Sequence, residues 1–272
     1  MKVYISADME GVAGVVNREQ LFAGGIEYQQ FREFMTAEVC AAIEGIRELG
    51  PCDVLVSDSH GSGLNLMPER MPDDVQLVRA WPRPLGMMAG IDESFDAALL
   101  LGYHASATNT GGIAAHTFSS KALTAVRING AEVSEATVSA LLAGHFNVPV
   151  VMVSGDDAAV DEISATLGPI EGAVVKWQYG HSSARTLMPQ AARTLIREAA
   201  KAGVARREDF QPHRIAGDLS LELSYKYAAP AELIAYLSNV ERVDNYTVKF
   251  VGNIIEVNGF IEVALGYSST LS

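Results

Sequence analysis

Two carboxylate side chains stand two residues apart near the start of the sequence. An apolar stretch, 3–7, is followed by Asp8, Met9, Glu10 and Gly11. In an extended chain, residues i and i+2 point to the same side, so we expect Asp8 and Glu10 to share a face and to repel each other. A bound cation, a basic side chain or solvent would offset that repulsion.

Histidines and another carboxylate follow two further apolar stretches. Asp58 and His60 come after residues 53–57, and His104 comes after residues 97–103. In open α/β sheets, ligands bind beyond the carboxyl ends of the strands, so these side chains are expected to meet the acidic pair at one edge. Carboxylates and imidazoles without thiolates suit Zn²⁺, Mn²⁺ or Co²⁺ and exclude a structural zinc site of the cysteine type.

Each of these residues taken singly has a simpler explanation. Asp8 could cap a loop, His60 could occupy a turn, and His104 could be a hydrogen-bonded histidine of the core. Ligand-type residues at three successive strand ends are much harder to explain by chance, so the sequence predicts a divalent-metal site. Asp156 and Asp157, after a fourth apolar stretch, are expected to cap a helix.

Two residues farther along the chain could extend this site. His116 lies in a loop of small residues, 108–120, where it could transfer protons near neutral pH or simply be an exposed histidine. Glu135 begins a predicted helix, where a carboxylate is favoured by the helix dipole. Glu135 could therefore be a cap or a further metal ligand, and Glu132 is the competing candidate for that ligand.

The elements that would position these side chains follow from the hydrophobic pattern. Continuous apolar runs separated by helical patterns indicate an α/β fold, with a mostly parallel sheet flanked by helices on both faces. Strands are expected at 3–7, 53–58, 97–104 and 149–157, and helices at 28–49, 135–146, 158–168 and 189–202. An Asn-Gly pair at 129–130 predicts a hairpin.

The last third of the sequence has a different pattern. Residues 218–225 alternate apolar and polar side chains, as in a strand with one exposed face, and a helix at 231–239 and a strand at 246–252 follow. We therefore predict a metal-site domain over residues 1–205 and a smaller α+β region over 206–272, for which oligomerisation is a candidate role.

Composition limits the classes of partner. A net charge of −13 over 272 residues disfavours nucleic acid and anionic membrane surfaces, which need clustered lysine and arginine. The hydrophobic content of 49% is enough for a sizeable core, and no apolar run reaches the length of a membrane span. Cys40 and Cys52 form no paired motif and no signal peptide is evident, so we expect reduced core cysteines in a cytoplasmic protein.

Taken together, these stretches resemble the D-aminopeptidase family of bacterial zinc metallopeptidases. The resemblance is carried by SADMEG at 6–11, DSH at 58–60, GYHA at 102–105 and VPVVMVSGDD at 148–157. It implies an aminopeptidase that uses two zinc ions per subunit to hydrolyse short peptides with an N-terminal D-residue, such as D-Ala-D-Ala. It also implies a ring-shaped homo-oligomer, a homodecamer, whose active sites face an enclosed chamber.

The same resemblance assigns roles to the candidate residues. The metal ligands would be one bridging carboxylate and four further side chains: Asp8 as the bridge, with Glu10, His60, His104 and Glu135. His116 would match the catalytic histidine of the family, described as a nucleophile or as a general base. We favour general acid–base catalysis, because two metal ions already supply the nucleophile. The family has a glycine at the position of Ser134.

Three other interpretations remain open at the level of the sequence. A dinuclear phosphoesterase also gathers Asp and His at strand ends, but it needs cations for phosphate, and Lys121 and Arg127 are the nearest in these loops. The others are an amidase of different specificity and a non-catalytic metal-dependent binding protein. Ligand types do not distinguish D from L substrates, because the shape of the pocket decides that preference.

Overall fold

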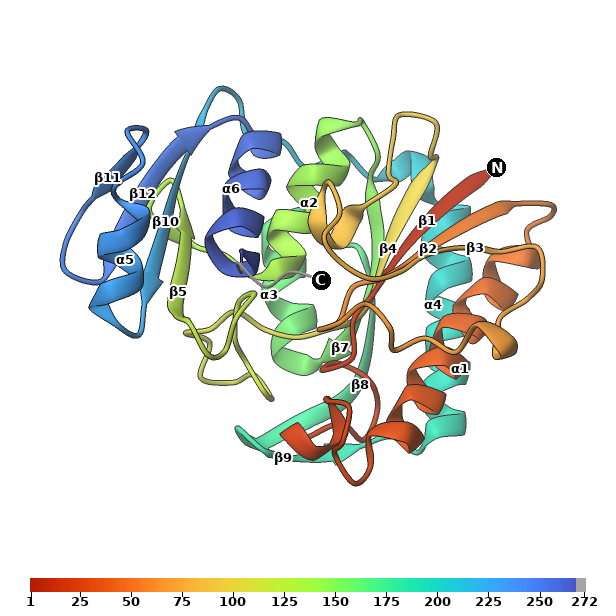
Figure 1. Cartoon of the computed structure of the whole chain (residues 1–272). Helices are drawn as coiled ribbons and strands as arrows, with labels where there is room; N and C mark the ends of the chain where they lie inside the picture. The colour runs from red at the N-terminus through yellow and green to blue at the C-terminus, as the bar shows by residue number, and fades with distance from the viewer. Residues whose placement is uncertain (268–272) are drawn as a thin grey trace.

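The computed structural model describes residues 1–267 and arranges them around two β-sheets (Figure 1). The larger sheet has the order β3-β2-β1-β4-β7-β8-β9 and is parallel except for its last pair, β8 and β9. Its strands are β1 (Lys2–Ala7), β2 (Asp53–Asp58), β3 (Gln76–Val78), β4 (Ala97–Tyr103), β7 (Val150–Asp156), β8 (Glu171–Gly180) and β9 (Ser183–Thr186). The predicted α/β fold with a mostly parallel sheet is confirmed.

Helices cover both faces of the larger sheet. The helices α1 (Tyr28–Arg47) and α4 (Pro189–Ala205) pack together on one face, and α2 (Glu135–His145) and α3 (Asp157–Leu167) lie on the other (Figure 1). Within β1, Val3 and Ile5 join the core beneath α1 and α4, whereas Tyr4 joins the opposite core. Because both faces are covered, β4 and β7 are buried at every position, which explains their continuous apolar sequences.

The smaller sheet is antiparallel and has the order β11-β12-β10-β5-β6. Its strands are β5 (Leu123–Ile128), β6 (Ala131–Glu132), β10 (Leu219–Tyr225), β11 (Val240–Arg242) and β12 (Thr247–Gly252), and the helices nearby are α5 (Ala228–Ile234) and α6 (Ile254–Gly266). This sheet combines strands from both sides of residue 205. The division of the chain at that residue stays a prediction.

In the described range, 1–267, four short 3-10 helices complete the regular structure: η1 (Arg18–Gln20), η2 (Pro68–Arg70), η3 (Gly86–Met88) and η4 (Arg207–Asp209). Two local features predicted from the sequence, a helix cap and a hairpin, are confirmed. The side chain of Asp156 caps α3 by accepting a hydrogen bond from the Ala159 amide. Asn129 and Gly130 both have positive φ angles, of 52° and 80°, as the predicted tight hairpin between β5 and β6 requires.

Among residues 1–267, the strands β3, β8, β9 and β11 and the helix α6 were not predicted from the sequence. The helix α5 lies at Ala228–Ile234 and not at the predicted 231–239. The apolar pattern of β8 is interrupted by Lys176, which hides it, whereas α6 begins with a recognisable capping box of Asn253 and Glu256.

Cys40 and Cys52 are free and only half-buried. Among the described residues, no helix is both long and apolar enough to cross a membrane.

Candidate metal centre

The side chains that the sequence singled out lie together at the carboxyl edge of the larger sheet. Six of them gather there: Asp8, Glu10, His60, His104, His116 and Glu135. The first two follow β1, the next two follow the neighbouring strands β2 and β4, the fifth lies in the loop after β4, and the last begins α2. Adjacent parallel strands end at the same edge, which is why residues so distant in sequence meet.

The loop after β1 is fixed against β4 by backbone hydrogen bonds. The Asp8 amide donates to the Leu101 carbonyl oxygen at 2.8 Å, and the Gly11 amide donates to that of Gly102 at 2.7 Å. A Cβ atom on Gly11 would lie 2.1 Å from the Tyr103 carbonyl oxygen, so only glycine allows this close approach. The contact determines where the acidic pair leaves the sheet.

Asp58 organises the loop that carries His60 and does not itself join the cluster. Its carboxylate accepts hydrogen bonds from the backbone and side-chain amides of Asn65, at 2.6 and 2.7 Å. The ring nitrogen Nε2 of His60 lies 2.8 Å from the Leu21 carbonyl oxygen. This contact turns the other ring nitrogen, Nδ1, toward Glu10, whose Oε2 is 2.8 Å away.

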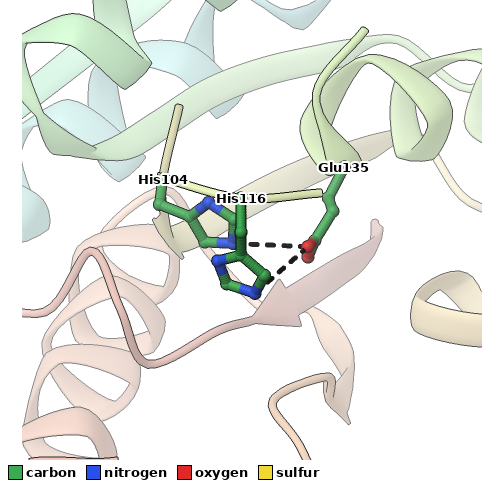
Figure 2. A group of neighbouring side chains, drawn as sticks. All are labelled: His104, His116 and Glu135. Carbon is green, nitrogen blue, oxygen red and sulfur yellow. Dashed lines mark ion pairs between the residues drawn. The ribbon is translucent and has the colours of Figure 1, made fainter. Parts of the chain in front are cut away.

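His104 and His116 stack on each other beside Glu135 (Figure 2). Their ring centroids are 4.1 Å apart and their planes differ by 8°. The Nε2 atoms of His104 and His116 lie 3.4 and 3.7 Å from the same oxygen, Oε1 of Glu135. In both rings Nδ1 contacts a backbone carbonyl oxygen, that of Ala105 at 3.0 Å and that of Ala114 at 2.9 Å.

The three histidines of the cluster therefore share one arrangement. One nitrogen of each ring contacts a backbone carbonyl oxygen, which can only accept, so that nitrogen carries a hydrogen. The other nitrogen faces carboxylate oxygens. Metal-binding histidines are commonly oriented in this way, by a carbonyl or carboxylate on the far nitrogen. A histidine of an ordinary core would not need to turn its second nitrogen toward a group of acids.

The centre of the cluster contains two polar atoms that have no hydrogen-bond partner among residues 1–267. These atoms, Oδ2 of Asp8 and Nε2 of His104, are both buried and lie 3.5 Å apart, which is rare in proteins. Two groups have ligand atoms within 4.8 Å of one another: Asp8 with Glu10 and His104, and His104 with His116 and Glu135. The donor types, their spacing and the unpaired atoms fit a divalent metal ion.

Burial and crowding shift the pKa values within this cluster. Burial, followed by the charge of Glu10, raises the pKa of Asp8 to about 8. Burial also acts to raise the pKa of Glu10, but the charge and hydrogen bond of His60 outweigh it and hold that pKa well below its usual range. Burial would lower the pKa of His104, yet Glu135 raises it to about 10. Protons thus offset the crowded negative charge, and a cation can replace them.

His116 differs from the other members of the cluster. Its side chain is 17% exposed, whereas the side chains of the other five are at most 6% exposed. Burial, and then the charge of His104, lowers the pKa of His116. This shift favours the neutral ring, in which Nδ1–H is bonded to Ala114 and Nε2 is able to accept a proton.

Of the two competing glutamates, Glu135 enters the cluster and Glu132 does not. Glu135 begins α2, which Ser134 caps with its hydroxyl, and Oε1 of Glu135 accepts a hydrogen bond of 2.5 Å from the Phe118 amide. Glu132 lies on β6 and pairs with Arg127 at 3.5 Å. The loop of His116 is thereby tied to the start of α2 through Phe118.

A cavity of about 610 Å³ opens onto the cluster, a size suited to a small ligand. Its apolar wall includes Phe22, Trp81, Phe118 and Ile261, the last from α6 at the far end of the chain. These wall residues were not predicted from the sequence, although Phe118 lies in the loop singled out for His116. The Trp-Pro-Arg-Pro run at 81–84 was a visible loop signal, but only the fold shows that it reaches the site.

A mostly parallel α/β sheet with buried carboxylates and histidines at its strand ends, beside a cavity, is the architecture of a metal-dependent hydrolase. The sequence model of the D-aminopeptidase family matches residues 1–262. The chain therefore belongs to the D-aminopeptidase family, as its motifs predicted.

Similar proteins agree with this assignment. A D-aminopeptidase of Bacillus subtilis (strain 168) is 34% identical over 215 residues, which cover 78% of this chain and 77% of that protein. The solved structure of the Zn-dependent D-aminopeptidase DppA from Bacillus subtilis, described as a self-compartmentalizing protease, matches with a TM-score of 0.94 at 29% identity. That match covers 100% of this chain and 99% of the other. The predicted class, a peptidase, is confirmed.

Proposed function

We propose that this chain uses two zinc ions to remove an N-terminal D-residue from short peptides. Its family and the zinc dependence of the similar solved enzyme support this chemistry. The proposal of two metal ions rests on the position of Asp8. Asp8 lies between two imidazoles, with Oδ1 3.3 Å from Nδ1 of His60 and Oδ2 3.5 Å from Nε2 of His104. A carboxylate in that position suits a bridge between two metal ions.

The remaining ligands would divide between the two sides of Asp8. Glu10 accompanies His60 at 2.8 Å, and Glu135 accompanies His104 at 3.4 Å. Each side would therefore offer an imidazole, a carboxylate and one oxygen of the bridge, all of them ligand types that zinc accepts. When bound, a zinc pair polarises the scissile carbonyl and makes water a better nucleophile.

His116 would transfer the protons of the reaction. Its Nε2 lies 3.7 Å from Glu135 and 4.0 Å from Glu10, and the residue lines the cavity. A neutral imidazole at this point can accept a proton from the attacking water and then donate it to the leaving amine. We favour this role over covalent attack by the ring, because the metal pair already provides a nucleophile.

The same cluster would select the N-terminus of a peptide. The α-amino group of a peptide would bind beside the carboxylates as a charged ammonium group, or it would ligate one metal ion as the neutral amine after losing a proton. The rest of a short peptide would occupy the cavity, in contact with Phe22, Trp81 and Phe118. The shape of this wall would then set the preference for a D-residue.

Activity and zinc content together test this proposal. The purified protein would be assayed with D-Ala-D-Ala, L-Ala-L-Ala and p-nitrophenyl phosphate, each with and without a chelator. We expect hydrolysis of the D-dipeptide that the chelator abolishes and zinc restores. Chelator-sensitive phosphatase activity alone would instead identify a phosphoesterase, and metal binding without any turnover would identify a binding protein.

We also propose that the chain assembles into a homo-oligomer, a ring of ten subunits as the resemblance implies. Large apolar side chains are exposed on and around α5, β11 and β12: Tyr227, Leu233, Tyr236, Tyr246 and Val251. Exposed apolar groups of this extent are typical of interaction surfaces. Mass photometry would measure the number of subunits, and a monomer would contradict this part of the proposal. A cytoplasmic location stays a prediction.

A further inference from the structure

A buried lysine lies behind the metal centre and does not line the cavity. Lys176, on β8, has an exposed fraction of 0% and is the one lysine or arginine with a buried side chain among residues 1–267. Its ammonium group donates to the carbonyl oxygens of Glu10, of Val12 at 3.2 Å and of Val15 at 2.7 Å. An ammonium group has three N–H donors, so the loop after β1 takes up all of them.

The peptide group between Glu10 and Gly11 is held at both of its ends. Its N–H, on Gly11, donates to the Gly102 carbonyl oxygen at 2.7 Å, and its C=O, on Glu10, accepts from Lys176. Because a peptide group is planar, two opposed contacts fix its orientation, and with it the direction in which the Glu10 side chain leaves the backbone. Asp8, in contrast, is held by the Leu101 carbonyl oxygen of β4.

We propose that Lys176 is a positioning residue for Glu10 and thereby tunes one side of the metal centre selectively. This inference rests on the proposed function. Glu10 contacts His60 at 2.8 Å, so a shift of Glu10 disturbs the ligands on that side of Asp8. Without the ammonium group, three buried carbonyl oxygens lose their donor, and the loop must rearrange to satisfy them. The opposite side, with His104, keeps its supports.

Lys176 also contributes charge to its surroundings. Acidic side chains act on it from three elements: Asp156 at the end of β7, Glu38 on α1, and Asp8 and Glu10 from the loop after β1. Replacement by methionine removes the donors and the charge together. Replacement by glutamine removes the charge but keeps a side-chain amide that can donate to the carbonyl oxygens. The two variants therefore separate hydrogen bonding from charge.

The test measures zinc affinity in the assembled, full-length protein. Wild type and Lys176→Met would be titrated with zinc against a competing chelator, with D-Ala-D-Ala hydrolysis followed in parallel. We expect one zinc site to weaken by about 10- to 100-fold, as happens when an outer-shell partner is lost, while the other keeps its affinity. At saturating zinc kcat should recover, and the KM for the dipeptide should not change. Lys176→Gln should fall between the two, and it replaces Lys176→Met if that variant does not fold.

The control is Ile46→Ala, at the end of α1 remote from the metal edge. Ile46 is 0% exposed, so its truncation lowers the melting temperature without touching the loop after β1. Lys176 variants that bind zinc as wild type does, or that lose both sites equally, would overturn the inference. A wild type that binds one zinc ion would refute the two-metal function separately. In that case the affinity for that single ion would be compared between the wild type and the Lys176 variants. Equal affinity would refute the inference.

Discussion

The two sheets of this protein place their acidic residues in opposite surroundings. On the outer face of the smaller sheet, Glu222 of β10 lies between Arg127 of β5 and Lys249 of β12, so this acid has a basic cross-strand neighbour on each side. At the edge of the larger sheet, Asp8 and Glu10 meet with Glu135. All three are buried, and within the described part of the chain no lysine or arginine forms an ion pair with them.

The difference shows that the acids of the larger sheet serve function at a cost in stability, whereas those of the smaller sheet serve stability. Opposite charges across strands stabilise a sheet modestly and can be replaced one at a time. Like charges that are buried together destabilise the metal-free fold, unless protons or a cation offset them. Departures from ordinary pairing rules that gather in one place therefore mark a functional site, and substitutions in the two regions should have very different effects.

The largest effect is expected for Asp8→Asn. Asparagine keeps the size of the side chain but removes the charge between His60 and His104, so both zinc ions would be held weakly. Activity on D-Ala-D-Ala should fall by more than the roughly 100-fold that loss of an outer-shell partner costs, and elemental analysis should show depleted zinc. Asp53→Asn, at the other end of the same sheet, is the matched control. Full zinc content and activity in Asp8→Asn would contradict the bridging role.

His116→Ala should separate catalysis from metal binding. The kcat for D-Ala-D-Ala should fall by about 10²- to 10⁴-fold, because a general acid–base group is lost. Zinc content should stay at the wild-type level, since the proposed ligands remain. Loss of zinc from the variant would show instead that Nε2 of His116 is a ligand, which its place beside His104 and Glu135 allows.

Glu38→Gln should change the pH dependence of stability. Burial raises the pKa of Glu38 to about 7, above its ordinary value of 4.5. The contribution of Glu38 to the stability of the wild type is therefore complete below pH 4.5. The free energy of unfolding then falls by about 3 kcal/mol as the pH rises through 7. The variant lacks this loss. Urea unfolding of the metal-free proteins at pH 5 and pH 8 would measure it, and parallel pH profiles would show that Glu38 ionises normally.

The smallest effect is expected in the smaller sheet. Glu222→Gln removes one acid from a half-exposed row in which both neighbours remain solvated, so the free energy of unfolding should fall by only about 0.2–1 kcal/mol. Zinc content and activity should not change. A large loss of either would mean that the two sheets are less independent than their charge patterns indicate.

Much of the site could be predicted because its signals are local. The strands β1, β2 and β4 are mostly apolar runs, and a ligand-type residue follows each of them closely, so one rule about strand ends brings Asp8, His60 and His104 together. Asp156 could be recognised as a helix cap because that signal, too, lies in neighbouring residues of the sequence. Glu135 could be a cap or a ligand from the sequence, and the structure places it in the cluster.

The remainder depends on packing, which no local pattern encodes. Ile261 reaches the cavity because α6 packs near α2 and η3, and the sequence around it reads only as an apolar helix. Lys176 breaks the apolar pattern of its strand, and its partners lie more than 160 residues earlier. The need for glycine at position 11 likewise comes from a contact with β4 that forms only in the folded sheet.

Anomalous diffraction at the zinc edge, from crystals of the zinc-loaded protein, would locate the metal ions themselves. We predict two peaks about 3.5–4 Å apart, one on each side of the Asp8 carboxylate, with the His60 and His104 rings each directed at one of them. A single peak, or peaks that lie away from Asp8, would rule out a two-metal site bridged by this carboxylate.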